Sequence, residues 1–181
     1  MQPASRLPLL LVALVAACGR SGEPRAVAEL APLGDSDILG TATFTAIGDG
    51  KVRVDADISG LAPGTHGFHI HEFGDCSDAE GKSAGGHFNP DHHAHSGPGP
   101  HGHAGDLGNI EADAGGEAHV SVTLDQISVD TGKHGILGRS LIVHEKADDL
   151  ASQPAGDAGG RIACAFIRSE SGTTKPVKPQ S

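Results

Sequence analysis

Short stretches of alternating apolar and polar residues recur along this chain and end at glycine-rich turns. Residues 51–58 (KVRVDADI) alternate most regularly, which is typical of a β-strand with one face in water. Asp49 and Gly50 precede them, and Asp-Gly between two such stretches is a strong hairpin signal. Beyond the N-terminal segment no stretch shows the 3.6-residue period of an amphipathic helix, and the chain holds 27 glycines. The pattern therefore predicts a β-sheet protein.

Eight strands are expected, and two pairs of them are expected to form hairpins: 38–47 with 51–58, and 109–112 with 118–124 across Gly115 and Gly116. The eight segments are 25–33, 38–47, 51–58, 66–72, 109–112, 118–124, 139–144 and 161–168. Short strands with glycine turns predict an all-β fold, an eight-stranded antiparallel Greek-key β-sandwich or flattened barrel. Residues 73–106 and 145–160 do not fit as strands, and loops of this length inside a domain are usually functional.

The N-terminal segment 1–17 is typical of an export signal, because Arg6 is followed by an apolar run that is too short to span a bilayer. Residues 15–18 (VAAC) resemble a bacterial lipobox, which predicts cleavage before Cys18 and lipid attachment to it. The alternative is an ordinary signal cut that leaves Cys18 as a free thiol. We expect a periplasmic location in the bacterial cell envelope, with the lipid in the outer membrane because Gly19 is not the aspartate of inner-membrane retention.

The chain then divides into a tether at 18–24, one domain at 25–168 and a disordered polar tail at 169–181. Apart from Cys18 the only cysteines are Cys76 and Cys164, an even set that predicts one disulfide in an oxidising compartment. The net charge is −10, or −11 once Arg6 is lost with the signal. This balance argues against a nucleic-acid partner and offers no basic stripe for anionic lipid, so lipid on Cys18 would be the membrane contact.

Histidines dominate the first long loop and its borders. Of the 12 histidines in the chain, eight lie between His69 and His103. His69 and His71 are two apart on an expected strand, so both rings point to one face and can bind one metal ion. His144 ends a distant strand where the second long loop begins. Nitrogen ligands suit zinc and copper, and three histidines with one carboxylate suit tetrahedral zinc.

Five segments together resemble the copper/zinc superoxide dismutase family. They are 67–74 (GFHIHEFG), 86–90 (GHFNP), 103–109 (HAGDLGN), 138–149 (GRSLIVHEKADD) and 159–164 (GGRIAC). The resemblance runs in order from about residue 25 to 168. It implies a β-sandwich enzyme that dismutates superoxide to dioxygen and hydrogen peroxide, with one copper and one zinc ion per subunit. Superoxide is then the small-molecule substrate, and a monomer and a homodimer are both compatible with the chain.

The resemblance also assigns roles to individual residues. It implies copper ligands His69, His71, His87 and His144, and zinc ligands His87, His95, His103 and Asp106, with His87 as the bridge. Asp148 is implied to hold a histidine on each side, and Arg161 to guide and orient superoxide beside the copper. Cys76 and Cys164 match the family disulfide, although Cys76 follows Gly74 more closely than in cytosolic eukaryotic members.

Two kinds of alternative remain open at this point. His93 is close enough in the sequence to His95 to replace it as a ligand, and His101 could replace His103 in the same way. The other histidines outside the pattern are expected to be structural or solvated: His66, His92, His119 and His134. The second kind concerns function. An exported copper- and zinc-binding protein without turnover, or a zinc sandwich with a vestigial copper site, would share the fold, but all four implied copper ligands and Arg161 count against both.

Overall fold

The computed structural model describes residues 22–179. The expected signal segment 1–17 and Cys18 lie outside the described residues. Residues 22–179 form eight β-strands and one short 3-10 turn, and none of their helical structure is long and apolar enough to cross a membrane. Each expected strand overlaps one observed strand, so the prediction of an eight-stranded all-β fold is confirmed.

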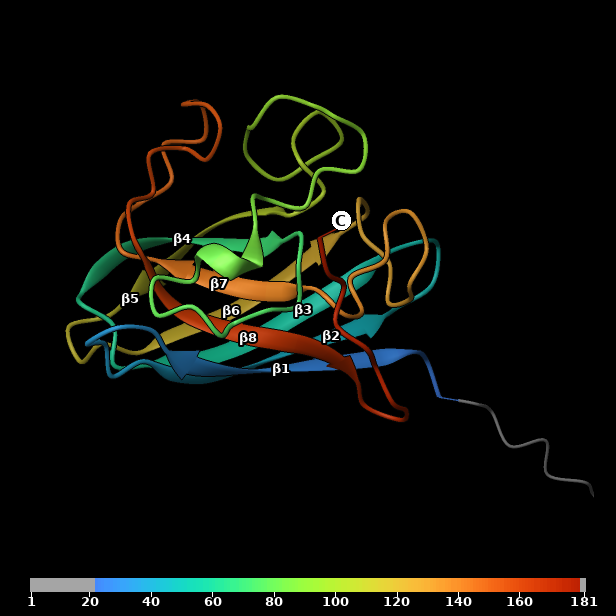
Figure 1. Cartoon of the computed structure of the whole chain (residues 1–181), viewed down its shortest axis with the longest axis horizontal. Helices are drawn as coiled ribbons and strands as arrows, with labels where there is room; N and C mark the ends of the chain where they lie inside the picture. Colours follow the sequence, from blue (N-terminus) through green and yellow to red (C-terminus); the bar gives the residue numbers. More distant parts are fainter. Residues whose placement is uncertain (1–21, 180–181) are drawn as a thin grey trace, which may run out of the picture.

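All neighbouring strands of the sheet are antiparallel, and they follow the order β5-β4-β7-β8-β1-β2-β3-β6. The elements are β1 (Arg25–Pro32), β2 (Leu39–Ala46), β3 (Val52–Ser59), β4 (Gly64–His71), η1 (Lys82–Ala84), β5 (Asp106–Ala112), β6 (Ala118–Leu124), β7 (Ser140–His144) and β8 (Arg161–Ser169). The sheet curls into a nearly closed barrel (Figure 1). Because β3 and β4 are consecutive but do not pair, the chain crosses from one half of the sheet to the other, as a Greek key requires.

The hydrophobic core fills the inside of the barrel. On β3 the apolar residues Val52, Val54 and Ile58 are buried and alternate with more exposed polar residues. Phe44 of β2 and Phe68 of β4 are completely or almost completely buried in the same core. Burial of a side chain of this size stabilises the fold by about 1.5–3 kcal/mol. The alternation seen in the sequence is therefore the origin of the barrel's two faces.

The two expected hairpins differ in outcome. The 38–47 and 51–58 pair is confirmed, since β2 and β3 pair along their whole length and Asp49 and Gly50 have the positive φ that their turn requires. The second hairpin is wrong. A tight turn does join β5 to β6, with the Asp113 amide bonded to the Glu117 carbonyl, but β5 pairs with β4 and β6 pairs with β3. The glycine signal marks the turn correctly but carries no information about the partner of each strand.

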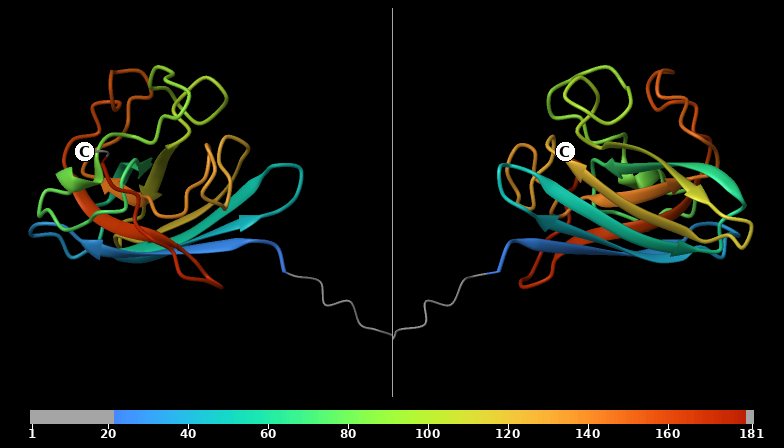
Figure 2. Two further views of the ribbon diagram at one scale, coloured as in Figure 1. Left: turned by 45° about the vertical axis from the view of Figure 1, so that its right-hand side comes forward. Right: turned by 180° about the vertical axis from the view of Figure 1, so that it is seen from behind.

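Both long loops lie together over the outer face of β4 and β7 (Figure 2). This explains why these two strands are buried on both faces, unlike β3. The Ile70 carbonyl of β4 accepts from the Phe88 amide, and the Ile70 amide donates to the Gly105 carbonyl, so the middle and the end of the first loop are bonded directly to the strand. A side chain that leaves the outer face of β4 or β7 therefore enters a space enclosed by loops.

The predicted disulfide is present between Cys76 of the first loop and Cys164 of β8, with Cα atoms 5.8 Å apart. It closes a separation of 88 residues. The chain-entropy model gives such a cross-link about 4 to 5 kcal/mol of stabilisation. The bond fixes the beginning of the first loop against the barrel.

The segment after β8 was expected to be a disordered tail from residue 169. Its described part instead returns to the barrel. The Gly74 amide donates to the Val177 carbonyl (3.0 Å), and the Val177 amide donates to Gly138 (2.6 Å). Gly138 has φ +89°, and a Cβ there would meet the Lys175 carbonyl at 2.4 Å, so a glycine is required under this segment.

Candidate metal centre

Four of the residues implied as metal ligands lie close together on the outer face of the sheet. His69 and His71 extend from β4 on one side, while Ile70 between them points into the core. His144 is the last residue of the neighbouring strand β7. His87 lies on the first loop and forms an isolated bridge with His71. The strand alternation and the loop thus bring four imidazoles to one point.

The remaining implied ligands lie next to them, and the seven residues form two groups that share His87. We call His69, His71, His87 and His144 the four-histidine group, and His87, His95, His103 and Asp106 the aspartate group. In each group one ligand atom per residue lies within 4.8 Å of the others, and all the residues are buried. Asp106 begins β5 opposite His69, so the two groups meet across a strand pair. The arrangement has two adjacent positions, each with four donors.

Several ring nitrogens in these groups are buried with no hydrogen-bond partner among the described residues. They include Nδ1 of His69 and Nε2 of His87 in the four-histidine group, and Nδ1 of His95 and of His103 in the aspartate group. A buried polar atom without a partner costs free energy, so such atoms are rare unless a ligand uses them. Their concentration in these two groups fits metal coordination.

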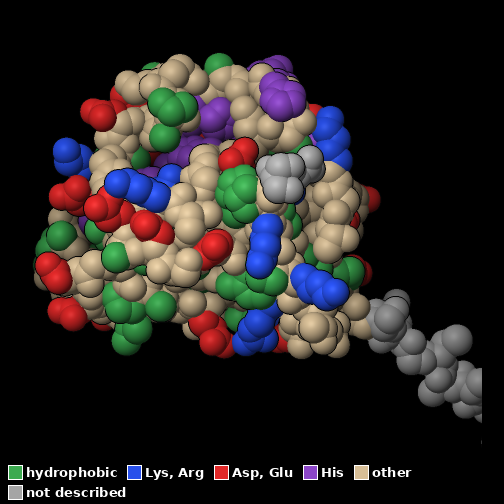
Figure 3. Space-filling model, in the orientation of Figure 1, with side chains coloured by type: hydrophobic (Ala, Val, Ile, Leu, Met, Phe, Trp, Pro, Cys, Tyr) green, Lys and Arg blue, Asp and Glu red, His purple; other side chains and the backbone are tan. Residues whose placement is uncertain are grey.

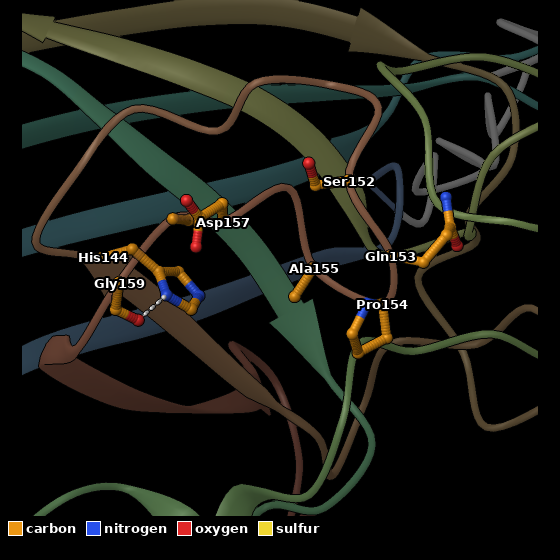
Figure 4. A pocket seen from close by; sticks show the side chains of 8 residues that line it. His144, Ser152, Gln153, Pro154, Ala155, Asp157 and Gly159 are labelled. Atoms are coloured by element: carbon orange, nitrogen blue, oxygen red, sulfur yellow. Dashed lines mark hydrogen bonds between the residues drawn. The ribbon is translucent and has the colours of Figure 1, made fainter.

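In His71 and His144, Nδ1 faces a backbone carbonyl, and this contact fixes the tautomer of each ring. His71 Nδ1 donates to the Gly85 carbonyl (3.0 Å), and His144 Nδ1 lies 3.5 Å from the Gly159 carbonyl (Figure 4). A carbonyl only accepts, so Nδ1 carries the hydrogen and Nε2 keeps its lone pair. The two Nε2 atoms are 3.4 Å apart. In metal-binding histidines, the ring nitrogen that does not bind the metal usually donates a hydrogen bond to a carbonyl, a carboxylate or water.

Asp106 is the centre of the aspartate group. One oxygen lies 2.8 Å from His87 Nδ1, and the other lies 3.1 Å from His95 Nδ1. Burial alone would raise its pKa, but the nearby His103 ring (Nδ1 3.3 Å from Oδ1) and the hydrogen bonds from His87 and the Ser96 amide outweigh burial and hold the pKa well below its usual value. Asp106 is therefore an ionised carboxylate that can balance the charge of a cation.

Asp148 links the two groups from behind. Its Oδ2 accepts from His69 Nε2 at 2.8 Å, and its Oδ1 accepts from His95 Nε2 at 2.9 Å. Burial would raise the pKa of Asp148, but the hydrogen bonds from His69 and His95 lower it to about 2. An ionised carboxylate in this place keeps the hydrogen of each ring on Nε2. Each Nδ1 is then left free for a metal ion.

His71, His87 and His144 of the four-histidine group have lowered pKa values and are neutral at pH 7. Burial lowers the pKa of His87 to about 4, although its bond to Asp106 opposes the shift. Burial, assisted by the neighbouring His69 ring, lowers the pKa of His144 to about 3, and burial also holds the pKa of His71 well below its usual value. Metal ions bind deprotonated imidazole, so the site is prepared for a cation at neutral pH.

Three further residues support the site and escaped the sequence analysis as functional residues. Gln153 of the second loop bonds both the amide (2.8 Å) and the carbonyl (2.9 Å) of His95. Asn109 of β5 bonds the Asp148 amide and carbonyl in the same way, at 2.8 Å each. At Gly156, with φ +66°, a Cβ would lie 1.8 Å from Asp148 Oδ1. Only Asn109 had a signal, because it ends one of the segments that carry the resemblance.

Solvent reaches the four-histidine group through the second loop. A pocket of ≈ 430 Å³ is lined by His144, Asp157, Gly159 and neighbouring loop residues (Figure 4). A second pocket, of ≈ 500 Å³, lies on the other side of Gly159 and is lined by Arg161, Lys82 and Gly160 among others. Histidine side chains are visible in a hollow of this surface (Figure 3). A small solute can therefore approach the group although its rings are almost fully buried.

Arg161 of β8 lies between the second pocket and the four-histidine group. Its guanidinium donates to the carbonyls of Gly81 and Gly85, the second at 2.6 Å. After burial, the charge of Arg161 is among the causes that lower the pKa of His71 and His144, so it acts directly on this group. Two of its N–H groups are used by the loop, and the guanidinium has five. The others can meet an anion.

The other histidines lie outside both groups. His66 is buried, with Nδ1 2.9 Å from the His144 carbonyl and Nε2 2.8 Å from Ala62, so it ties β4 to the end of β7. The structure places His95 and His103 in the aspartate group, and neither His93 nor His101 takes their place. His119 and His134 pair with Asp57 and Asp91 at the surface.

Comparisons with known proteins agree with this geometry. The family model of copper/zinc superoxide dismutase (SODC) matches residues 38–167. A solved structure described as the clock protein EA4 is 44% identical, with a TM-score of 0.73, and the match covers 83% of this chain and 97% of that chain. The matched family binds copper and zinc, and the four-histidine and aspartate groups fit a copper site and a zinc site respectively.

Proposed function

Because the chain belongs to the copper/zinc superoxide dismutase family, we propose that it converts two superoxide anions and two protons into dioxygen and hydrogen peroxide. The observation that carries the proposal is the pair of buried donor groups that share His87 and contain the unpartnered ring nitrogens. We assign His69, His71, His87 and His144 to copper, and His87, His95, His103 and Asp106 to zinc. When bound, copper supplies a one-electron couple that oxidises one superoxide and reduces the next, whereas zinc keeps one redox state.

His87 is proposed as the bridge and as the proton carrier. Its Nδ1 lies 2.8 Å from Asp106 in the aspartate group, and its Nε2 is buried without a partner in the four-histidine group. One ring therefore presents a nitrogen to each position. A proton held at Nε2 would lie where peroxide forms, and its transfer to the product would return the ring to the bridging state.

Arg161 is proposed to bind and orient superoxide. Its bonds to Gly81 and Gly85 fix the guanidinium, so the remaining N–H groups are preorganised for an anion. The net charge of −10 repels superoxide at long range, and a local cation is needed to oppose that repulsion. Focusing of the field in a cleft raises association rates by about 10- to 1000-fold.

The alternative is a copper- and zinc-binding protein of the same fold without turnover. One observation favours it: the similar solved structure is described as a clock protein, at 44% identity to this chain. The complete set of copper donors together with Arg161 supports the enzyme, since storage of a metal ion requires no cation that orients an anionic substrate.

Export and anchoring are part of the proposal and rest on the N-terminal sequence. Residues 1–17 would be removed, Cys18 would carry lipid, and residues 18–24 would tether the domain 25–168 to the periplasmic face of the outer membrane. The disulfide between Cys76 and Cys164 supports an oxidising compartment. The enzyme would then protect the cell envelope, as a monomer or a homodimer.

The proposal is tested by the superoxide dismutation rate of the full-length protein loaded with copper and zinc. His144→Ala removes one copper donor, whereas His119→Ala removes an exposed histidine of β6 and serves as the matched control. We expect fast turnover that His144→Ala abolishes and His119→Ala retains. Full metal loading with a rate no greater than that of free copper would favour the binding protein.

A further inference from the structure

A segment of the chain follows the last strand of the barrel. β8 ends at Ser169, and the match to the family model ends at residue 167. The Ser169 amide donates to Thr174 Oγ1 (2.8 Å), which closes a turn after the strand. The chain then runs back from the end of β8 along the barrel (Figure 1). We call residues 173–179 the strap, and they lie beyond the part of the chain that the family model matches.

Val177 of the strap contacts the rest of the protein through its backbone. Its carbonyl accepts from the Gly74 amide (3.0 Å), and its amide donates to the Gly138 carbonyl (2.6 Å). Val177 is half-buried, whereas Pro176 and Lys178 beside it are exposed. Gly74 belongs to the first long loop, and Gly138 lies just before β7. One strap residue therefore joins the loop to the start of β7.

The contact between the strap and the loop is close and is favoured by charge. A Cβ on Gly74 would lie 2.2 Å from the Gly138 carbonyl oxygen, so the loop passes too close to Gly138 for any other residue at this position. Hydrogen bonds from Ser77 lower the pKa of Asp75 most, and the positive charge of Lys178 also lowers it. The strap thus offers a positive charge to the acidic residue that follows Gly74.

The strap holds a part of the loop that is folded back on itself. The Phe73 amide donates to the Ala84 carbonyl (2.9 Å), and the Glu72 amide donates to the Gly86 carbonyl (3.0 Å). Residues 72–74 are therefore paired with residues 84–86, and the strap fixes Gly74 at the end of this pairing. The position of residues 84–86 thus depends on the position of Gly74.

Gly85 lies within this pairing and holds two side chains of the candidate metal centre. Its carbonyl accepts from the Arg161 guanidinium (2.6 Å) and from His71 Nδ1 (3.0 Å). Arg161 is proposed to orient superoxide, and His71 is proposed to bind copper. A series of backbone hydrogen bonds therefore leads from the strap to the acceptor that both side chains share.

The disulfide fixes the same part of the loop by a second route. Cys76 comes shortly after Gly74 in the sequence, and it is bonded to Cys164 of β8. The strap and the disulfide therefore hold neighbouring points of the loop through different contacts. When two contacts hold one segment, loss of either is largely compensated by the other, and loss of both is not, so their effects are not additive.

We propose that Val177 is a positioning residue for Arg161 and His71. Through Gly74 the strap keeps the Gly85 carbonyl in place, in parallel with the disulfide. The consequence for turnover rests on the proposed function, because that function gives Arg161 its role. The hold of the strap on the loop does not depend on it.

The test uses substitutions in the full-length protein loaded with copper and zinc. Val177→Pro removes the amide that donates to Gly138, and Thr174→Val removes the acceptor that closes the turn after β8. Each is made alone and together with the disulfide-free pair Cys76→Ala/Cys164→Ala. Lys175→Ala, at an exposed strap residue, is the matched control in both backgrounds.

Amide hydrogen exchange measures the hold of the strap on the loop. We expect exchange of the Glu72 and Phe73 amides in the combined variants to exceed the product of the separate effects by about 2- to 150-fold, the range of coupling between residues of one network. Lys175→Ala should show no such excess. Exchange of the β3 amides should not change, which separates a local effect from a general loss of stability.

The dismutation rate of the same proteins, compared at equal metal content, tests the positioning of Arg161. We expect the rate to fall in the combined variants and to stay close to that of the matching Lys175→Ala control in the single ones. Exchange effects that simply multiply would overturn the parallel hold of strap and disulfide. Coupled exchange with an unchanged rate would overturn the positioning role. A wild-type protein without turnover would refute the proposed function instead, and exchange would still decide whether the strap holds the loop.

Discussion

Asp148→Asn is the substitution for which the structure gives the most specific expectation. The carboxylate accepts from His69 Nε2 through Oδ2 and from His95 Nε2 through Oδ1, and Oδ1 also accepts from the Leu150 amide at 2.6 Å. An asparagine side chain has only one accepting oxygen. The Leu150 amide, as a donor, selects that oxygen for the Oδ1 position, so the new NH₂ group faces His69.

An NH₂ group in that place opposes the N–H of His69. The ring relieves the clash by moving its hydrogen to Nδ1, and Nδ1 is the buried nitrogen that faces the four-histidine group. His69 then cannot coordinate. Loss of an orienting partner costs about 10- to 100-fold in metal affinity, or about 1.4–2.7 kcal/mol. We expect copper affinity to fall by this factor and zinc affinity to fall by less, because His95 keeps its acceptor.

The assay is chelator competition for each metal with the full-length protein. Asp157→Asn is the matched control, since it removes the same charge from the same loop and Asp157 lines the pocket beside His144 without a hydrogen bond to a proposed ligand. The loop should stay in place in Asp148→Asn because Asn109 bonds the backbone of residue 148 and not its side chain. Unchanged copper affinity, or loss of zinc with copper retained, would refute the tautomer argument.

Three other substitutions or conditions give sharp expectations. The pKa of His87 is about 4 and that of His144 about 3 in the folded protein, both below the usual 6.5, so the unfolded chain binds more protons. The metal-free protein should therefore lose stability as the pH falls from 6.5 towards 4, by about 3 kcal/mol for His87 alone, and a urea midpoint that stays constant over this range would contradict it. Gly156→Ala should displace Asp148 and release zinc in equilibrium dialysis, because the new Cβ would lie 1.8 Å from Oδ1; wild-type zinc content would show that the loop moves freely. Arg161→Glu should slow dismutation markedly with both metals bound, and an unchanged rate would remove Arg161 from the mechanism.

Local sequence patterns were sufficient to predict where the strands lie in the sequence. The alternation in 51–58 reflects the two faces of β3, and Asp49 and Gly50 adopt the positive φ values that their turn requires. The partner of a strand is set by distant segments, which is why the turn before β6 was correct and the proposed β5–β6 pairing was wrong. The tail was expected to be mobile because its composition is polar, yet its backbone groups satisfy Gly74 and Gly138.

The proposed ligands could be listed before the structure because metal coordination restricts residue type and spacing. His69 and His71 need only the period of a strand, and the others follow the family pattern. Two of the supporting residues, Gln153 and Gly156, could not be listed in this way. Gln153 contacts His95 across 58 positions, and both lie on loops whose shapes no local rule fixes. Gly156 is required by the position of Asp148, which becomes apparent only when the second loop is folded.

The central claim is that two different metal ions share His87. Anomalous diffraction from crystals of the copper- and zinc-loaded protein, recorded at the absorption edge of each metal, tests it most directly. We expect a copper peak among His69, His71 and His144, a zinc peak among His95, His103 and Asp106, and a nitrogen of His87 bound to each. A single peak, or two peaks with His87 bound to only one of them, would contradict it.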